Sequence, residues 1–148
     1  MYDTDYRAAQ AADVDAVQAC VERAYAVAFR MIDDLPDVTQ DIAGDIARHA
    51  TIVAEKSGTV VGVIIFDAVE DALMIFNLAV APEARGSGVA RRLMMFAEQH
   101  AKKHGLTRLR LRTHRHLSGA IAMYQHLGWV KQDVVGNSVT MGKDVMNT

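Results

Sequence analysis

The feature that most constrains this fold is an apolar run that ends in a glycine-rich turn and continues as a helix. The run "ALMIFNLAVAP" (Ala72–Pro82) is almost continuously apolar, which is typical of a strand buried on both faces. Pro82 lacks the N–H that a strand interior needs, so the strand is expected to end there. From Gly88 to about His104 the apolar residues recur at helical spacing. The core stripe of that helix is predicted to consist of Val89, Leu93, Ala97 and Ala101.

Changes in the spacing of apolar residues, between the period of a strand and that of a helix, predict the other elements. In the first third they are a short strand at Tyr2–Ala8, a helix from an N-cap at Asp13 to about Met31, a loop at Asp33–Asp41 and a short helix at Asp41–His49. They continue with a hairpin over Ala50–Ala68 that turns at Ser57-Gly58, a strand at Thr107–His114, a helix at Ser118–Gly128, and a final hairpin of Trp129–Val135 and Ser138–Val145. Gly105 is expected to close the long helix. Helices that interrupt a mostly antiparallel sheet predict a mixed α/β domain of three layers.

Composition narrows the class of protein. A chain of 148 residues, 51% of them hydrophobic, is expected to form one domain over residues 1–148. A net charge of −2 argues against a protein that neutralises the phosphates of a nucleic acid. The single cysteine, Cys20, excludes an internal disulfide and suits a reducing compartment. No apolar run is long enough to span a bilayer and no signal peptide is apparent, so we expect a cytoplasmic protein.

The turn between the central strand and the long helix favours an anionic ligand. A helix N-terminus presents unpaired N–H groups and the positive end of the helix dipole. Gly86 and Gly88 let a phosphate approach the main chain, and Arg85, Arg91 and Arg92 add positive charge. The turn is neither a Walker loop nor a dinucleotide fingerprint, and an ordinary glycine-rich turn with no ligand is the alternative.

The residues around this turn resemble a known family. "RGSGVA" (Arg85–Ala90) fits the pattern R/Q-x-x-G-x-G/A, and "FNLAVAPEARGSGVARRLMMFAEQHAKKHG" resembles the central strand, loop and long helix of the GCN5-related N-acetyltransferase (GNAT) family. "LRLRTHRHLSGAIAMYQHLGW" resembles that family's next strand and its A-x-x-x-Y-x-x-x-G-[FW] helix, and "VTMGKDV" resembles the last strand of many small bacterial members. The strong resemblance runs from about Ile75 to Val145.

The resemblance implies a fold, a cosubstrate and a reaction. It implies a three-layer fold with a twisted, mostly antiparallel sheet of about seven strands flanked by four helices. It also implies an acetyl-CoA-dependent N-acetyltransferase that acts on a primary amine of a small molecule, amino acid or peptide by direct attack in a ternary complex. The residues implied to bind acetyl-CoA are Leu78, Ala79, Val80, Arg85, Gly86, Ser87, Gly88, Val89, Ala90 and Arg91.

The resemblance also implies two catalytic groups. A backbone amide near Leu78 or Val80 would polarise the thioester carbonyl. Tyr124 would donate a proton to the leaving sulfur, since a phenol stays protonated at neutral pH. The general base stays open, because Asn77 stands where relatives often have a carboxylate. The candidates elsewhere are Asp33, Asp34, Glu70, Asp71, His114 and His116.

This chain departs from the family's pattern at several positions. Ala90 replaces the commoner last glycine of the loop, and Leu117 and Ala120 stand where relatives have an asparagine that contacts coenzyme A. A basic stripe of Arg108, Arg110 and Arg112 alternates with Leu109 and Leu111 along one strand. The stripe is either a solvated or ion-paired strand face, or a site where Arg110 or Arg112 binds a carboxylate of the acceptor. The acceptor residues are expected to be Asp33, Asp34, Arg112 and His114.

Other classes of function are less well supported. His100 and His104 lie four residues apart but lack the glutamate of a zinc motif, so we expect no metal. Nucleic-acid and membrane binding are not expected, and the protein is predicted to be a monomer or homodimer. The alternative from another class is a non-catalytic acyl-CoA-binding sensor or partner-binding module of the same fold, because Asn77 cannot accept a proton.

Overall fold

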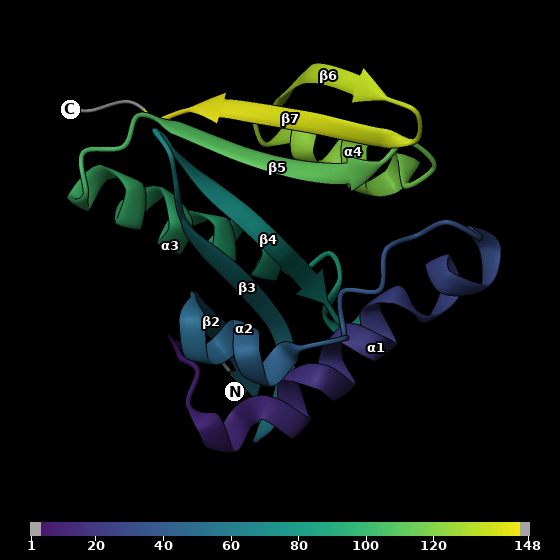
Figure 1. Ribbon diagram of the computed structural model, residues 1–148. Coiled ribbons are helices and arrows are strands. Elements are labelled where there is room, and N and C mark those ends of the chain that lie inside the picture. The colour runs from purple at the N-terminus through teal and green to yellow at the C-terminus, as the bar shows by residue number, and fades with distance from the viewer. Residues whose placement is uncertain (1–3, 146–148) are drawn as a thin grey trace. The chain divides into compact units, whose positions relative to one another are not determined.

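The computed structural model describes residues 4–145, which contain seven strands, four α-helices and two short 3-10 helices (Figure 1). Their bounds are β1 Asp5–Ala8, η1 Ala11–Asp13, α1 Val14–Met31, α2 Ile42–Arg48, β2 Ala50–Lys56, β3 Thr59–Val69, β4 Ala72–Val80, η2 Pro82–Ala84, α3 Val89–Lys103, β5 Arg108–His114, α4 Ser118–His126, β6 Val130–Val135 and β7 Ser138–Asp144. Every predicted helix and strand is present. The first strand was expected from Tyr2, but residues 1–3 lie outside the described part, and within that part it begins at Asp5.

The strands form one seven-stranded sheet in the order β1-β2-β3-β4-β5-β7-β6. The pairs β1–β2, β2–β3, β5–β7 and β6–β7 are antiparallel, whereas β4 and β5 run parallel. The parallel register covers Leu73–Ile75 of β4, paired with Leu109–Leu111 of β5. The mixed α/β fold with a mostly antiparallel sheet and four helices is therefore confirmed.

The described chain divides into two compact units, and both β4 and α3 contribute to each of them. Unit 1 comprises the chain up to Phe66 together with Asn77–Phe96, and unit 2 comprises Asp67–Phe76 together with the chain from Ala97 onward. That the chain acts as a single domain stays a prediction.

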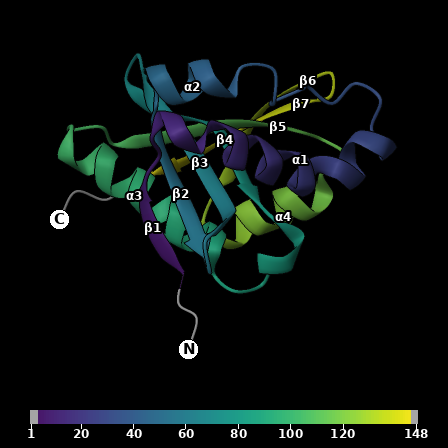
Figure 2. The same ribbon diagram turned by 90° about the horizontal axis from the view of Figure 1, so that it is seen from below.

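Unit 1 is built on the hairpin of β2 and β3, with β1 beside β2 (Figure 2). Its core includes Val17 and Val21 of α1 and Val89 and Leu93 of α3, all buried. Gly62 of β3 allows α3 to approach closely, because a Cβ on Gly62 would lie 2.8 Å from a methyl group of Val89. The predicted apolar stripe of α3 is thus confirmed at its first two positions.

Unit 2 contains the three-stranded part of the sheet formed by β5, β7 and β6. Leu109, Leu111 and Met141 are buried on one face, and Ala97 and Ala101 continue the buried stripe of α3. Gly105 and Gly128 follow α3 and α4 with positive φ angles of 71° and 96°, which favour glycine at the end of a helix. Both helix ends are therefore where the glycines predict them.

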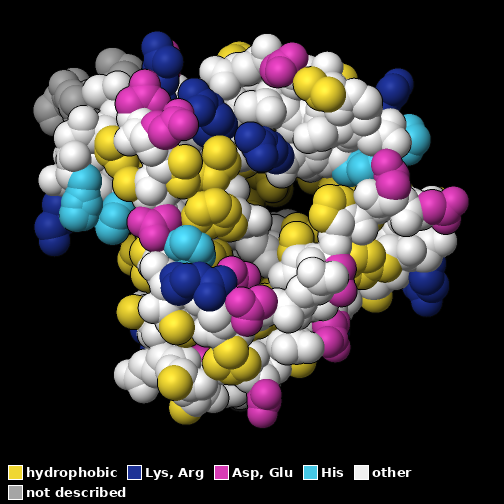
Figure 3. All heavy atoms as spheres, viewed as in Figure 1, with side chains coloured by type: hydrophobic (Ala, Val, Ile, Leu, Met, Phe, Trp, Pro, Cys, Tyr) yellow, Lys and Arg dark blue, Asp and Glu magenta, His cyan; other side chains and the backbone are white. Residues whose placement is uncertain are grey.

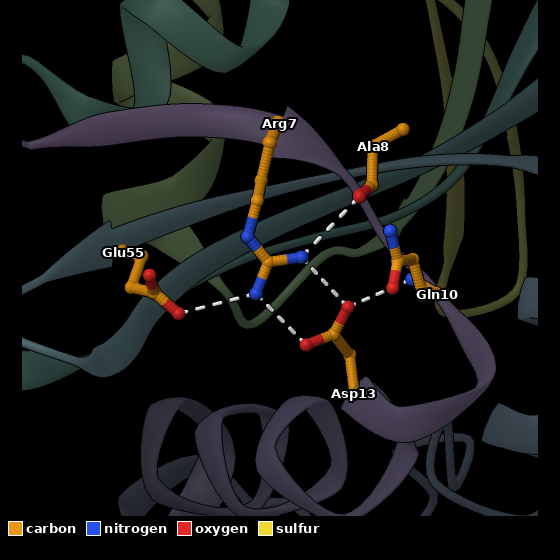
Figure 4. A network of polar contacts seen from close by, with 5 residues as sticks. All are labelled: Arg7, Ala8, Gln10, Asp13 and Glu55. Atoms are coloured by element: carbon orange, nitrogen blue, oxygen red, sulfur yellow. Dashed lines mark hydrogen bonds and ion pairs between the residues drawn. The ribbon is translucent and has the colours of Figure 1, made fainter.

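Asp13 lies at the expected start of α1, but its side chain does not cap that helix. Its carboxylate accepts hydrogen bonds from Arg7 Nη1 at 2.8 Å and Arg7 Nη2 at 2.9 Å, and from the Gln10 N–H at 2.7 Å (Figure 4). Arg7 Nη2 also donates to Glu55 of β2 at 3.1 Å. A forked guanidinium makes stronger hydrogen bonds than a neutral N–H at a helix end, which explains why the side chain turns toward β1. The network ties β1, η1 and β2 together.

Candidate active site

The C-terminal half of β4 supplies the first part of the candidate site. Leu78–Val80 lie beyond the three residues of β4 that pair with β5, and they lead directly into η2 and the glycine turn. The Leu78 carbonyl accepts a hydrogen bond from the Tyr25 hydroxyl of α1 at 3.3 Å. This end of β4 therefore has main-chain groups outside the parallel register, as an added extended ligand would require.

The turn before α3 supplies the second part. Gly86 and Gly88 have φ angles of 78° and 85°, in the left-handed region that favours glycine. A Cβ at either position would meet no atom within 4 Å, so the space beside both residues is open. The first helical bond of α3 runs from the Arg92 N–H to the Gly88 carbonyl at 3.0 Å, which leaves the N–H groups of the first turn available to a ligand. This arrangement suits an anion.

Arg85 belongs to the wall of the turn. Its N–H donates to the Pro82 carbonyl at 3.3 Å, and its guanidinium donates to the Ala24 carbonyl of α1 at 2.7 Å. The Ser87 hydroxyl donates to the Ala84 carbonyl. The side chains of Arg85 and Ser87 thus hold the turn in place, and the N–H groups free to bind an anion begin at Gly86.

Two arginines place positive charge on the first turn of α3. Arg91 and Arg92 are both exposed, and the Arg92 guanidinium lies 5.6 Å from the ring centre of Tyr6. Burial raises the pKa of Tyr6, with Arg92 acting in the opposite direction. The charge expected from the sequence is therefore present near the turn.

Tyr25 is a functional candidate that the sequence did not single out. The helical period identifies it only as one member of the apolar stripe of α1. In the structure its hydroxyl reaches the main chain of Leu78, and burial raises its pKa to about 12. Tyr25 therefore stays protonated and donates at any physiological pH. No local pattern could have indicated a contact between residues so far apart in the sequence.

Asn77 is buried, with 6% of its surface exposed, and neither its Oδ1 nor its Nδ2 has a hydrogen-bond partner in the described chain. The residue precedes the Leu78–Val80 segment. An unpaired buried amide is costly, since its groups lose hydrogen bonds to water without replacement. The sequence placed Asn77 near the site, but only the structure shows its isolation.

Tyr124, the predicted proton donor, belongs to unit 2. It lies on α4 with 8% of its surface exposed, and its ring is 6.1 Å from that of Trp129. The Trp129 N–H donates to the Tyr124 carbonyl at 3.0 Å, which fixes the turn after α4. The ring is therefore packed inside unit 2, and the hydrogen bond to the carbonyl holds the backbone of Tyr124.

Arg112 and His114 lie on β5, where both belong to the face opposite Leu109 and Leu111. Arg112 is exposed, whereas His114 is 5% exposed. The His116 N–H donates to His114 Nδ1 at 3.0 Å, which orients the imidazole ring.

The other predicted acceptor and base residues are exposed. Asp33 and Asp34 follow α1 in unit 1, and Glu70 and Asp71 form the turn between β3 and β4 in unit 2. The structure thus places the turn, Leu78 and the two aspartates in unit 1, and Tyr124, Arg112 and His114 in unit 2.

Three further observations bear on function. In residues 4–145 there is no group of three or more His, Cys, Asp or Glu side chains that could hold a metal ion. None of the helices in the described part of the chain has the length and apolar character of a membrane-spanning segment. Cys20 is fully buried, and burial raises the pKa of its thiol to about 11.

Comparison with known families decides the identity of the fold. The Acetyltransferase (GNAT) family matches residues 17–129. The chain belongs to this family. The match includes β4, the glycine turn and Tyr124, which are the features that the resemblance in the sequence singled out.

Curated relatives of this GNAT chain are named as N-acetyltransferases. N-acetyltransferase family 8 member 2 of Rattus norvegicus is 33% identical over 66% of this chain and 45% of its own length. The uncharacterized N-acetyltransferase YjgM of Escherichia coli (strain K12) is 31% identical over 73% of this chain and 64% of its own length. The matched region thus spans about half to two thirds of these relatives.

Solved structures have the same fold. PaiA N-acetyltransferase from Thermoplasma acidophilum, whose crystal structure is in complex with coenzyme A, superimposes with a TM-score of 0.86. The alignment covers 96% of this GNAT chain and 99% of the other, at 18% identity. At that identity the likeness concerns the fold alone.

Proposed function

We propose that this chain is an acetyl-CoA-dependent N-acetyltransferase that acetylates a primary amine by direct attack in a ternary complex. The observation that carries the proposal is the turn of Gly86 and Gly88, which has positive φ angles, open space beside both residues and the first turn of α3 behind it. Membership of the GNAT family supports the same reaction.

The residues present fit the cosubstrate. We propose that the N–H groups from Gly86 to Arg91 hold the pyrophosphate, with Arg85 fixing the wall of the turn through Ala24. The main chain of Leu78–Val80 lies outside the register with β5 and would pair with an extended arm, while the Leu78 carbonyl also accepts the hydrogen bond from Tyr25. When bound, acetyl-CoA would supply the acetyl group as an activated thioester.

The proposed chemistry uses a main-chain donor and a side-chain donor. The Leu78 N–H donates to the carbonyl oxygen that gains negative charge, and Tyr25 helps to hold this strand end through the Leu78 carbonyl. As the C–N bond forms and the C–S bond breaks, the amine gives a proton to solvent water and the Tyr124 hydroxyl gives one to the sulfur. Tyr124 then recovers its proton from solvent.

The state of Cys20 supports direct attack. A covalent acyl-cysteine intermediate would need a nucleophilic thiolate, and Cys20 is the single cysteine of the chain. Because it is fully buried and its pKa is raised to about 11, Cys20 stays a thiol at neutral pH. The acceptor amine is therefore the proposed nucleophile toward the thioester.

Two measurements test the proposal. Calorimetry with coenzyme A tests binding, and release of free thiol from acetyl-CoA in the presence of a panel of amines tests transfer. We expect amine-dependent turnover that falls about 100-fold in Tyr124→Phe with little change in the dissociation constant for coenzyme A. Absence of heat with millimolar coenzyme A would overturn the assignment.

A non-catalytic acyl-CoA-binding module is the second candidate. The buried amide of Asn77, where relatives often have a carboxylate, is the observation that favours it. This alternative predicts that the wild-type chain binds coenzyme A and acetylates none of the amines in the panel. Amine-dependent release of thiol excludes it.

A further inference from the structure

The two faces of β5 differ sharply in character. Leu109 and Leu111 are buried on one face, and the side chains of Arg108, Arg110 and Arg112 alternate with them on the other. In Figure 1, α4 lies behind β5 and β7, so the opposite face of these strands is turned toward the viewer. Figure 3 shows Lys and Arg side chains in dark blue gathered over this part of the surface. On this face Arg108 and Arg112 are exposed, Arg110 is half-buried and His114 is buried, so the basic stripe reaches the surface of unit 2.

The register with β7 defines the neighbours of two of these arginines. Arg110 pairs with Gly142, and Arg112 pairs with Thr140. Paired residues on adjacent strands have Cα atoms about 5 Å apart, and residues two apart on one strand are separated by about 6.6 Å. The two arginines thus lie side by side on β5. Their neighbours on β7 are Gly142, which has no side chain, and Thr140, which has a hydroxyl group.

A third polar group covers the position of Gly142. Strand β6 has an irregularity in its pairing between Lys131 and Asp133, which leaves Gln132 as an extra residue. A Cβ on Gly142 would lie 2.3 Å from Gln132 Nε2, so the carboxamide of Gln132 lies directly over this glycine. The bulge and the glycine together place an amide donor on the same face as Arg110.

The charge of these arginines is not compensated within the structure. Neither Arg110 nor Arg112 makes an ion pair or a side-chain hydrogen bond with a residue in 4–145, which removes the expectation of an ion-paired strand face. Two carboxylates share this face, but neither lies directly beside these arginines. Asp144 of β7 is paired with Arg108. Asp133 lies on β6, where it is paired with Thr140 of β7, so strand β7 separates it from β5.

We propose that Arg110, Arg112 and Gln132 form a binding site for a carboxylate, and that the acceptor amine carries this carboxylate. Two guanidinium forks and an amide N–H are donors that match the acceptor oxygens of a planar carboxylate. The inference rests on the proposed function, because it names the substrate class of the same transfer reaction.

The test uses amines in matched pairs in which a carboxylate is replaced by a carboxamide of the same shape. We expect kcat/KM of the wild type to favour the carboxylate member about tenfold or more, chiefly through KM. Arg110→Met and Arg112→Met should remove this preference, and Gly142→Ala should reduce it by displacing Gln132. Arg108→Met is the matched control, since Arg108 lies on the same strand and face but opposite Asp144.

The outcomes separate this inference from the proposed function. Transfer without any preference, or equal loss in Arg108→Met, overturns the carboxylate site and leaves the acetyltransferase assignment standing. A preference for phosphonate over carboxylate analogues also overturns it. If no amine is acetylated, the Nε–H signals of Arg110 and Arg112 in NMR decide: they should shift with N-acetylated amino acids and not with their amides, and unchanged signals refute the site.

Discussion

At the scale of single residues, the buried amide of Asn77 is expected to lower the free energy of unfolding. Its Oδ1 and Nδ2 are both inaccessible and have no partner in the described chain. Leaving a buried polar group unsatisfied costs about 1–3 kcal/mol, whereas an apolar residue of similar shape avoids that cost. Proteins accept such costs mainly where a site requires them.

Replacement of Asn77 by Leu should therefore stabilise the protein. We expect the free energy of unfolding to rise by about 1 kcal/mol in urea titrations, because the two unpaired groups disappear. Thr51→Val is the control, since Thr51 is also buried but its hydroxyl donates to the His49 carbonyl at 3.3 Å. A destabilised Asn77→Leu variant would contradict the isolation of the amide.

Cys20 offers a second prediction at this scale. With a pKa of about 11, about 0.1% of the thiol is ionised at pH 8, far less than for an ordinary cysteine. We expect Ellman's reagent to react with the native protein at pH 8 only as fast as the protein unfolds. The same protein in denaturant should react at once, and rapid labelling of the native thiol would show that Cys20 is accessible.

At the scale of elements, the network of Arg7, Asp13 and Glu55 predicts how stability depends on pH. Hydrogen bonds from Arg7 lower the pKa of Asp13 to about 2. A lowered pKa means that the contribution is complete above the unfolded-state value of about 3.9 and is lost as pH falls toward 2. Because Arg7 is partly exposed, we expect a contribution of about 1 kcal/mol.

The comparison of Asp13→Asn with the wild type isolates this contribution. Urea titrations between pH 2 and pH 6 should show a stability difference near pH 6 that disappears near pH 2. Asp15→Asn is the matched control, since Asp15 is exposed on the same helix and makes no ion pair with a described residue. An Asp13→Asn difference that does not change with pH would refute the assigned cause.

Variants at the two ends of α3 can separate the cost of backbone strain from a loss of coenzyme A binding. Gly88 and Gly105 have positive φ angles of 85° and 71°, and a Cβ would meet no atom within 4 Å at either position. Replacement of either by Ala should cost about 1 kcal/mol of stability through backbone strain. Only Gly88→Ala should also weaken coenzyme A binding in calorimetry. Equal affinities of the two variants would remove the proposed role of the turn.

At the scale of the whole molecule, coenzyme A should stabilise the folded state. A ligand that binds only the folded chain adds about 2.7 kcal/mol at a hundred times its dissociation constant. For a chain of this size we expect the melting temperature to rise by roughly 5–10 °C in a thermal melt. Pantetheine alone, which lacks the pyrophosphate, should have a much smaller effect at the same concentration. Equal shifts for the two ligands would contradict a site centred on the turn.

Much of the fold could be predicted because its signals are local. The apolar run of β4, the stripe of α3 and the glycines after α3 and α4 each reflect the period or the turn of a short segment. The Asp13 side chain was the exception, because its preferred partner, Arg7, belongs to the preceding strand. Candidate residues of the turn and of the acceptor side could both be named from the sequence, and their roles stay predictions. The contact between Tyr25 and Leu78 could not be named, because the two residues lie far apart in the chain.

The sequence by itself determined the order of the elements, the glycine turn that opens α3 and the resemblance to the GNAT family, since all three depend on residues close together in the chain. Only the tertiary structure decided that Tyr25 reaches Leu78, that Asn77 is buried without a partner and that Gln132 lies over Gly142 beside Arg110. These contacts arise when helices pack and strands pair in one register. A register depends on the burial of whole faces, which no short segment specifies alone.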